Sequence, residues 1–237
     1  MAKSNDLRHD KTTLLIKQSL ATKLKEEIVN GHLTPGQRII EGYWAKRFGV
    51  AQSSVREAIN LLIGEGFVTK RSGRSARVTS YSETDIAQIY ELRGALEGLA
   101  ARQIVQRQPD LKPLEFVFKE MRQATRDGNV QKLIEADLRF HLALCELSGN
   151  HFLHSQVRTL LVPLFAFVSM RTVQSSQTAA AWRSDLERHR RIIDVIREAD
   201  PFAADLLYVP LCNNSRQEPM RFGKSIKTRF RTSSLFS

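Results

Sequence analysis

The sequence predicts a mainly helical protein built from two domains, and three observations lead to that fold class. With 237 residues, 42% of them apolar, the chain is long enough for two hydrophobic cores. Apolar residues recur at helical spacing over most of its length, and alternation typical of strands is confined to residues 67–79. The net charge is +7 over residues 1–80 and −1 over residues 81–210. A basic first domain and a near-neutral second one indicate separate tasks, and a basic surface suits a polyanionic partner.

Charge and helix-start signals divide the chain further. The sequence Ser82-Glu83-Thr84-Asp85 is typical of a capping box, which opens a helix and leaves only a short hinge before it. We therefore expect four segments: a flexible tail (1–12), a first domain (13–80), a second domain (82–210) and a basic, irregular tail (211–237).

Composition also bears on where the protein works. The longest apolar-rich stretch, Leu160–Met170, is shorter than the roughly 20 residues that a helix needs to cross a bilayer. The residues after Met1 contain no hydrophobic core of a secretion signal. The two cysteines, Cys145 and Cys212, provide no disulfide framework. We therefore expect a cytoplasmic protein with no membrane partner.

Helical spacing and turn residues give the first domain its order of elements. Apolar side chains four residues apart predict a helix over Leu14–Asn30, which a glycine then ends. After a turn at Thr34-Pro35-Gly36, shorter helices are expected at Glu41–Phe48 and Gln52–Glu65, separated by Gly49-Val50. Two short helices joined by a tight turn that contains glycine form a helix-turn-helix.

The second short helix has the features of a recognition helix. Its first turn, Gln52-Ser53-Ser54, carries polar side chains that can cap the helix and face phosphates or base edges. Arg56 lies on the outer face, where a guanidinium can bind a phosphate or a guanine. Strands are expected next at 67–70 and 76–79, joined by a basic hairpin tip, Arg71–Ser75. This order of elements predicts a winged helix-turn-helix that binds duplex DNA.

These residues carry a resemblance to a known family. The segments Phe48–Ile59 and Glu65–Val68 resemble the GntR-family motif, and Leu33–Gly36 resembles the turn before the family's second helix; the match covers residues 14–79. Members bind DNA through the start of the recognition helix and the tip of the wing. The resemblance therefore implies DNA contacts from this chain's Gln52, Ser53, Ser54, Arg56, Gly73 and Arg74.

Two positions depart from the family pattern. Members commonly have arginine where Gln52 stands, and often where Gly42 stands. Glutamine prefers adenine edges, whereas arginine prefers guanine. We therefore expect an operator sequence that differs from the one bound by arginine-bearing relatives.

The second domain is predicted to be an all-α antiparallel bundle, because no strand alternation occurs in it. Glycine, proline and polar loops separate its helical stripes. We expect helices at about 85–106, 113–126, 130–147, 151–173, 180–198 and 201–208.

A candidate metal site lies in this bundle. Asp137 and His141 are four residues apart and therefore share one helix face, and His189 lies on a later helix. One carboxylate and two imidazoles suit zinc, nickel or a similar divalent ion. The same pattern also occurs on solvated faces and in ordinary hydrogen bonds. His151 and His154 are further candidates, although their place at a helix start favours surface positions.

The bundle also resembles a family domain, the FCD effector domain of the FadR/VanR branch. Four segments carry the resemblance: Glu91–Glu97, Asp137–His141, Ser148–Asn150 and Glu187–Ile193. Many members hold a metal with one Asp and three His and bind a small carboxylate beside it. The resemblance implies metal ligation by Asp137, His141 and His189. It also implies effector binding by Arg93 and, more loosely, Arg171; for both arginines an ordinary salt bridge is the alternative.

The family's fourth ligand is missing. It would lie near Leu211, but no histidine follows His189. Cys212 is one residue further on and follows Pro210, which interrupts the helical pattern. The tail either is a diverged or frame-shifted replacement for the end of the last helix, or is a basic extension that adds phosphate affinity. We expect a three-ligand site that binds metal more weakly than four ligands would.

Together these features predict a DNA-binding transcriptional regulator, with repression as the working expectation, and not an enzyme. A small carboxylate metabolite would control its affinity for a double-stranded operator, and a homodimer would match a two-fold DNA site. Two alternatives remain open. One is a metal-dependent hydrolase that uses Asp137, His141 and His189. The other is a dimeric DNA binder whose effector site has decayed.

Overall fold

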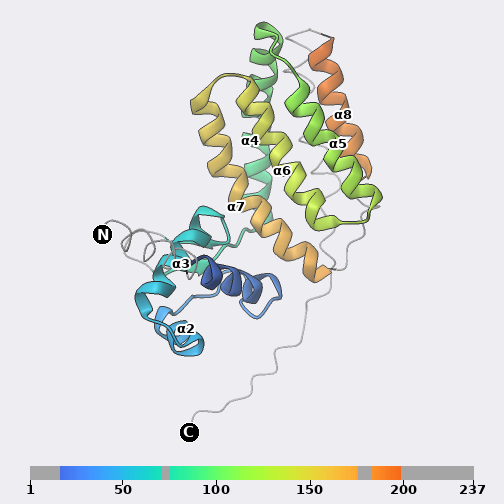
Figure 1. Ribbon diagram of the computed structural model, residues 1–237. Coiled ribbons are helices and arrows are strands. Elements are labelled where there is room, and N and C mark those ends of the chain that lie inside the picture. The colour runs from blue at the N-terminus through green and yellow to red at the C-terminus, as the bar shows by residue number, and fades with distance from the viewer. Residues whose placement is uncertain (1–16, 71–74, 176–182, 199–237) are drawn as a thin grey trace, which may run out of the picture.

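The computed structural model describes residues 17–70, 75–175 and 183–198. Figure 1 shows a smaller N-terminal body, the head (residues 17–79), below a bundle of longer helices (residues 83–197). Residues 17–29 form the first helix. The elements that follow are α2 (Glu41–Phe48), α3 (Gln52–Gly64), β1 (Val68–Thr69), β2 (Arg77–Val78), α4 (Glu83–Arg107), α5 (Lys112–Arg126), α6 (Val130–Leu147), α7 (His151–Ser175) and α8 (Arg183–Arg197).

The head contains the predicted helix-turn-helix. Gly49 ends α2 with φ +66°, a left-handed conformation that glycine adopts at little cost. The next N–H, that of Val50, donates to the carbonyl of Ala45 at 3.0 Å and so satisfies an open carbonyl of α2. Arg56 is exposed on the outer face of α3, as predicted. The inner face is buried and consists of Val55, Ala58, Ile59 and Leu62.

A small antiparallel hairpin follows α3, as expected for a wing. Val68 of β1 lies opposite Val78 of β2, and Thr69 lies opposite Arg77. Each strand has two residues, fewer than predicted, and Arg38 adds an isolated bridge to Arg77. Thr79 closes the hairpin against α3, because its buried hydroxyl donates to the carbonyl of Gly66 at 2.6 Å.

One local prediction in the head is wrong. The polar residues at the start of the recognition helix do not cap it: the N-cap is Ala51, and no side chain accepts a hydrogen bond there. The first backbone contact is from the N–H of Ser54 to the carbonyl of Ala51 at 3.0 Å. Consequently Gln52 and Ser53 are exposed and Ser54 is half-buried, with their side chains not committed to capping.

The capping box before the bundle is confirmed. The Ser82 hydroxyl accepts from the N–H of Asp85 at 3.1 Å, and the Asp85 carboxylate accepts from the N–H of Ser82 at 2.8 Å. Further along, Asn129 caps α6 through the N–H of Lys132 at 2.9 Å. The predicted helix 201–208 and the positions Gly73, Arg74, Leu211 and Cys212 lie outside the described residues.

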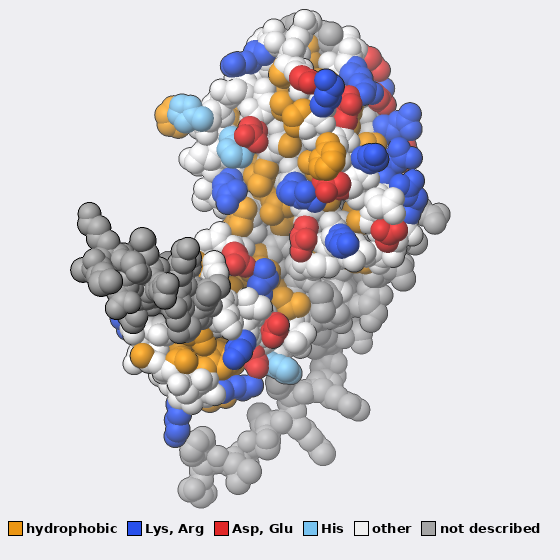
Figure 2. All heavy atoms as spheres, in the orientation of Figure 1, with side chains coloured by type: hydrophobic (Ala, Val, Ile, Leu, Met, Phe, Trp, Pro, Cys, Tyr) orange, Lys and Arg blue, Asp and Glu red, His pale blue; other side chains and the backbone are white. Residues whose placement is uncertain are grey.

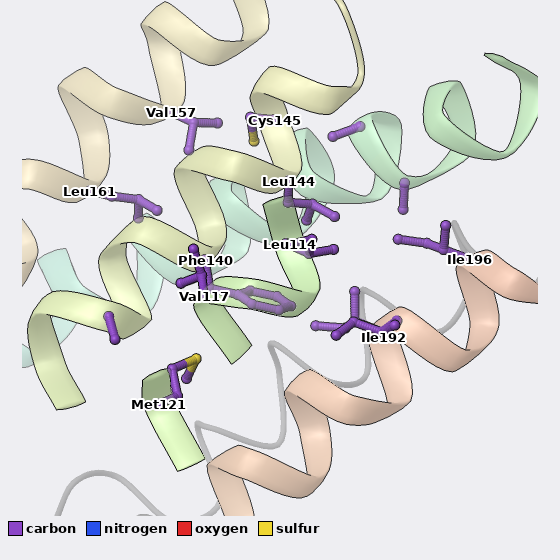
Figure 3. Packing of buried hydrophobic residues seen from close by; sticks show 14 of the residues in the cluster. Leu114, Val117, Met121, Phe140, Leu144, Cys145, Val157, Leu161, Ile192 and Ile196 are labelled. Carbon is purple, nitrogen blue, oxygen red and sulfur yellow. The ribbon is translucent and has the colours of Figure 1, made fainter. Parts of the chain in front are cut away.

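The core of the bundle lies between α4, α5, α6, α7 and α8 (Figure 3). Phe140 of α6 is completely buried at its centre, and side chains from the neighbouring helices surround it. The residues labelled in Figure 3 are Leu114, Val117, Met121, Phe140, Leu144, Cys145, Val157, Leu161, Ile192 and Ile196. On the visible surface of the bundle, acidic and basic side chains are interspersed (Figure 2), in agreement with the near-neutral charge of this segment.

Helix α7 belongs to both bodies. Its N-terminal half contributes Leu153, Val157 and Leu161 to the core of the bundle. Further along, Ala166, Phe167 and Met170 belong to the hydrophobic cluster of the head. The stretch His151–Thr172 is long and apolar enough to cross a membrane by composition, but half of it is buried inside the fold. We interpret its apolar character as the consequence of packing against two bodies.

The head and α7 meet most closely at Gly66. This residue has φ +79°, and a Cβ added to it would lie 2.6 Å from Cα of Pro163. Beside this contact, the rings of Tyr81 and Phe167 pack edge to face with centroids 5.6 Å apart. Backbone atoms on the α7 side leave no room for adjustment, so only glycine fits between α3 and β1 here.

We predict that Gly66→Ala destabilises the protein much more than Gly49→Ala. Both residues have positive φ, a conformation that costs a non-glycine residue about 1–2 kcal/mol, but nothing lies within 4 Å of a Cβ at Gly49. At Gly66 the overlap with Pro163 adds roughly 1–3 kcal/mol of overpacking. Urea unfolding of both variants measures the difference. Equal free energies of unfolding would show that the head does not press against α7.

Candidate functional site

The candidate metal ligands converge in the interior of the bundle. Asp137 and His141 are one turn apart on α6, and His189 faces them from α8; all three are buried. Oδ1 of Asp137 lies 3.0 Å from Nε2 of His141 and 2.8 Å from Nε2 of His189. The two Nε2 atoms are 3.1 Å apart. The three ligand atoms therefore form a compact triangle.

Two charged residues of α4 complete this cluster. Glu97 is fully buried, and its carboxylate accepts from Nε of Arg93 at 3.1 Å. It also lies 3.1 Å from Nδ1 of His141. The guanidinium of Arg93 reaches the other nitrogen of that ring, with Nη2 at 2.5 Å from Nε2 of His141. His141 is thus held between α4 on one side and Asp137 and His189 on the other.

Opposite effects set the charge of the cluster. Burial alone would raise the pKa of the Asp137 carboxyl, but attraction to the His189 and His141 rings and the hydrogen bonds from them outweigh burial and hold the pKa far below its usual range. For His141, burial and the charge of Arg93 lower the pKa, whereas Glu97 and Asp137 raise it, and the net effect is upward. Asp137 is therefore an anion ready to bind a cation, and His141 retains a proton more readily than an ordinary histidine.

The donor set fits a divalent ion. Bond lengths of roughly 2.0–2.2 Å from zinc to nitrogen and oxygen put tetrahedral ligands roughly 3.3–3.6 Å apart. The sides of the triangle are 2.8, 3.0 and 3.1 Å, so the three side chains need to separate by only a few tenths of an ångström, roughly, to hold an ion. Glu97 lies beside Nδ1 of His141 and favours a proton there, so loss of the Nε2 proton gives the tautomer whose Nε2 lone pair can bind an ion. The guanidinium of Arg93 also lies against Nε2. Binding of an ion at Nε2 therefore requires the guanidinium of Arg93 to move away from His141.

Aromatic rings enclose the cluster. Phe140 packs edge to face on His189, with centroids 4.7 Å apart. Phe165 of α7 lies 6.2 Å from the ring of His141. Phe165 is two residues from Phe167, which packs against Tyr81 at the junction with the head. One helix therefore contacts both the buried cluster and the head.

The structure places the predicted DNA-contact residues as follows. Gln52, Ser53 and Arg56 are exposed on the first turns of α3. Gly73 and Arg74 are outside the described residues. The guanidinium of Arg171, the looser candidate for the effector, lies over the ring of Phe167 at 5.9 Å, on the part of α7 that faces the head.

Two residues with evident roles were not identified from the sequence. Glu97 follows Arg93 by one helical turn inside the Glu91–Glu97 motif. Each of the two charged residues is followed by a glycine, Gly94 and Gly98, on the buried face of α4, and this pattern could have indicated the pair. Glu41 begins α2, and its carboxylate contacts both Gln52 and Arg56 of α3. Nothing in the spacing of Glu41 predicts that contact.

Comparison with protein-family models gives two matches. The model described as "Bacterial regulatory proteins, gntR family" matches residues 16–78, which include the helix-turn-helix and the wing. The model described as "FCD domain" matches residues 88–208, which include the buried cluster.

Known proteins agree with these matches. The Bacillus subtilis protein named "Uncharacterized HTH-type transcriptional regulator YdhC" is 30% identical, covering 84% of this chain and 88% of its own. The "Probable D-xylose utilization operon transcriptional repressor" of Paenarthrobacter nicotinovorans is 25% identical, covering 81% and 84%. The solved structure of E. coli McbR/YncC has the same fold, with a TM-score of 0.64 at 19% identity over 87% of this chain and 97% of that one.

Fold, site and relatives together define a DNA-binding transcriptional regulator with a helical effector domain. The chain belongs to the GntR family, in the group whose C-terminal domain is an FCD domain. The relatives are regulators of transcription, not enzymes, which excludes the metal-dependent hydrolase that the histidines and aspartate alone left open.

We predict that Glu97→Ala is strongly destabilising, by roughly 3–5 kcal/mol, because it leaves the guanidinium of Arg93 buried without its carboxylate. Glu120→Ala is the matched control. Glu120 pairs with Arg139 at 2.8 Å on the surface of the bundle, where such pairs contribute about 1 kcal/mol or less. Urea unfolding at neutral pH compares them, and similar losses would mean that the buried network does not hold the bundle together.

Proposed function

We propose that the protein represses transcription by binding a palindromic operator as a homodimer, and that a small carboxylate metabolite controls this binding from the FCD domain beside a divalent metal. The observation that carries the proposal is the triangle of Asp137, His141 and His189 with an arginine next to it. With a metal ion in the triangle, such a site would offer an effector carboxylate two positive partners in one buried place: the metal ion and the guanidinium of Arg93.

On the DNA side, the exposed first turns of α3 would enter the major groove. The amide of Gln52, the hydroxyls of Ser53 and Ser54 and the guanidinium of Arg56 would contact base edges and phosphates. By family resemblance, the wing would add Gly73 and Arg74. Two heads related by two-fold symmetry would read two half-sites.

In the bundle, Asp137, His141 and His189 would hold zinc or nickel, with positions left for water or the effector. The bound metal would supply a positive centre that attracts a carboxylate oxygen. Arg93, once released from His141, would bind the same carboxylate through its guanidinium, while Glu97 keeps its Nε in place. Arg171 is a second candidate, which would have to act from the α7 surface near Phe167.

Control of operator binding by the metabolite would follow from linkage between the two sites. The heads of the dimer would have one arrangement that fits the operator and one that does not, and the metabolite changes DNA affinity only if it binds these two arrangements with different affinity. Helix α7 supports such a difference, because Phe165 contacts the cluster while Phe167 packs in the head. We infer repression because the similar proteins of Paenarthrobacter nicotinovorans (D-xylose utilization operon), E. coli (GlaR) and B. subtilis (gluconate operon) are named repressors, whereas the similar Glc operon protein of E. coli is named an activator. A cytoplasmic location follows from the same role.

We predict that the protein binds about one zinc per chain and that His141→Ala removes this binding. The matched control is His151→Ala, since His151 lies exposed at the start of α7. Cys212→Ser should have no effect, because three ligands suffice. Competition titration with a zinc indicator measures occupancy, and equal uptake by His141→Ala and wild type would contradict the site.

The same titration should depend on pH in a defined direction. A protonated histidine cannot bind zinc, and the pKa of His141 is raised, so occupancy should fall with falling pH from above the usual histidine range. Occupancy that is unchanged down to pH 5 would contradict ligation by histidine.

A further inference from the structure

Glu41 connects the two helices of the helix-turn-helix. It stands at the first position of α2, and its carboxylate reaches across to α3. Oε2 accepts from Nη2 of Arg56 at 2.9 Å and from Nε at 3.1 Å. The same oxygen accepts from Nε2 of Gln52 at 3.2 Å. One carboxylate therefore holds both side chains that the proposed function directs at base edges.

The contact leaves the outer edge of Arg56 unused. Glu41 takes Nε and one hydrogen of Nη2, which form the side of the guanidinium. Among the described residues Nη1 has no hydrogen-bond partner, and the side chain is 53% exposed, against 20% for Glu41. Nη1 and the second hydrogen of Nη2 are the parallel pair that matches O6 and N7 of guanine. Arg56 is therefore fixed with its reading edge outward.

Gln52 is constrained in a comparable way. Its amide must turn Nε2 toward Glu41, because Oε1 would face a carboxylate oxygen with no hydrogen between them. This leaves Oε1 and the second Nε2 hydrogen available. That donor and acceptor are the pair that matches N6 and N7 of adenine. The carboxylate thus selects one of two amide orientations before DNA binds.

We propose that Glu41 is a specificity-determining residue that positions Gln52 and Arg56 for base reading; this inference rests on the proposed DNA face of α3. Ordering both side chains in advance reduces the entropy that the specific complex loses. The carboxylate also disfavours contacts of α3 with arbitrary phosphates, since like charges repel at short range. Hydrogen bonds from Arg56 lower the pKa of Glu41, so the group is ionised at neutral pH.

A purely structural role makes a different prediction. If Glu41 only held α2 against α3, its removal would weaken binding to every duplex by the same factor. A positioning role acts on the specific duplex alone, and loss of a negative charge from the DNA face leaves non-specific binding unchanged or stronger. The ratio of the two affinities separates the two roles.

The experiment uses the full chain and two probes: a duplex selected from random DNA by the wild-type protein, and a scrambled duplex of equal length and composition. Glu41→Ala should lower the affinity ratio by about tenfold or more, the discrimination that one good bidentate contact provides. Glu41→Gln, which keeps the shape, should lower it less. The control is Glu27→Gln, because Glu27 pairs with Arg47 at 2.8 Å and has a similar exposure of 18%. This control should leave the ratio unchanged.

A ratio that is the same in Glu41→Ala, Glu27→Gln and wild type, or an equal loss on both duplexes, would overturn the inference. Thermal melting verifies that each variant is folded, and the conservative Glu41→Gln remains informative if the alanine variant does not fold.

Arg56→Ala tests the proposed DNA face separately and should also reduce specific binding by about tenfold or more. If Arg56→Ala loses specific binding but the Glu41 variants do not, the proposed DNA face of α3 is supported and the positioning role of Glu41 is overturned. If Arg56→Ala binds as wild type, the proposed face itself is wrong.

Discussion

Helix α7 is packed into two hydrophobic cores at once, that of the head and that of the bundle. The arrangement of the other elements depends on which residues of α7 each core contains. Its first half is buried among α4, α6 and the rest of the bundle, while Ala166, Phe167 and Met170 complete the core of the head. Interiors packed at crystal-like density do not deform continuously, so a shift of α7 in one core must be accommodated in the other. The tight fit of Gly66 on Pro163 makes that accommodation stricter still. The head is therefore joined to the bundle by packing as well as by the hinge.

Beside this helix the bundle buries a group of charges that stability alone does not explain. Arg93, Glu97, Asp137, His141 and His189 are all withdrawn from water, and each has partners within the group. A buried ionic network is often no more stable than well-packed apolar residues of the same size. Its presence in the FCD domain is consistent with ligand binding. Its contact with Phe165 puts any change at the site next to the helix that reaches the head.

The sequence predicted the local features of this fold well and its long-range contacts poorly. Periodicity and caps depend on neighbours in the chain, so α2 was placed correctly, α3 to within one residue and the capping box at Ser82 correctly. Asp137 and His141 were found because i, i+4 spacing is itself visible; His189 was named from its residue type on a later helix, and family resemblance strengthened the set of three. The role of Glu97 was missed because it depends on a contact between helices with no periodic signal. Glu41 was missed for the same reason. The double role of α7 was also hidden, since a helix that is apolar on several faces resembles any core helix.

We propose that the buried cluster and the DNA-binding head are energetically coupled through α7. Coupling between two sites is reciprocal, so DNA bound at the head must affect the bundle. Hydrogen exchange of the backbone amides, with and without the selected duplex, measures this effect directly. We expect slower exchange not only in the head but also in α7 from Leu161 to Met170 and in α6 around His141. Slower exchange confined to residues 17–79 would contradict it.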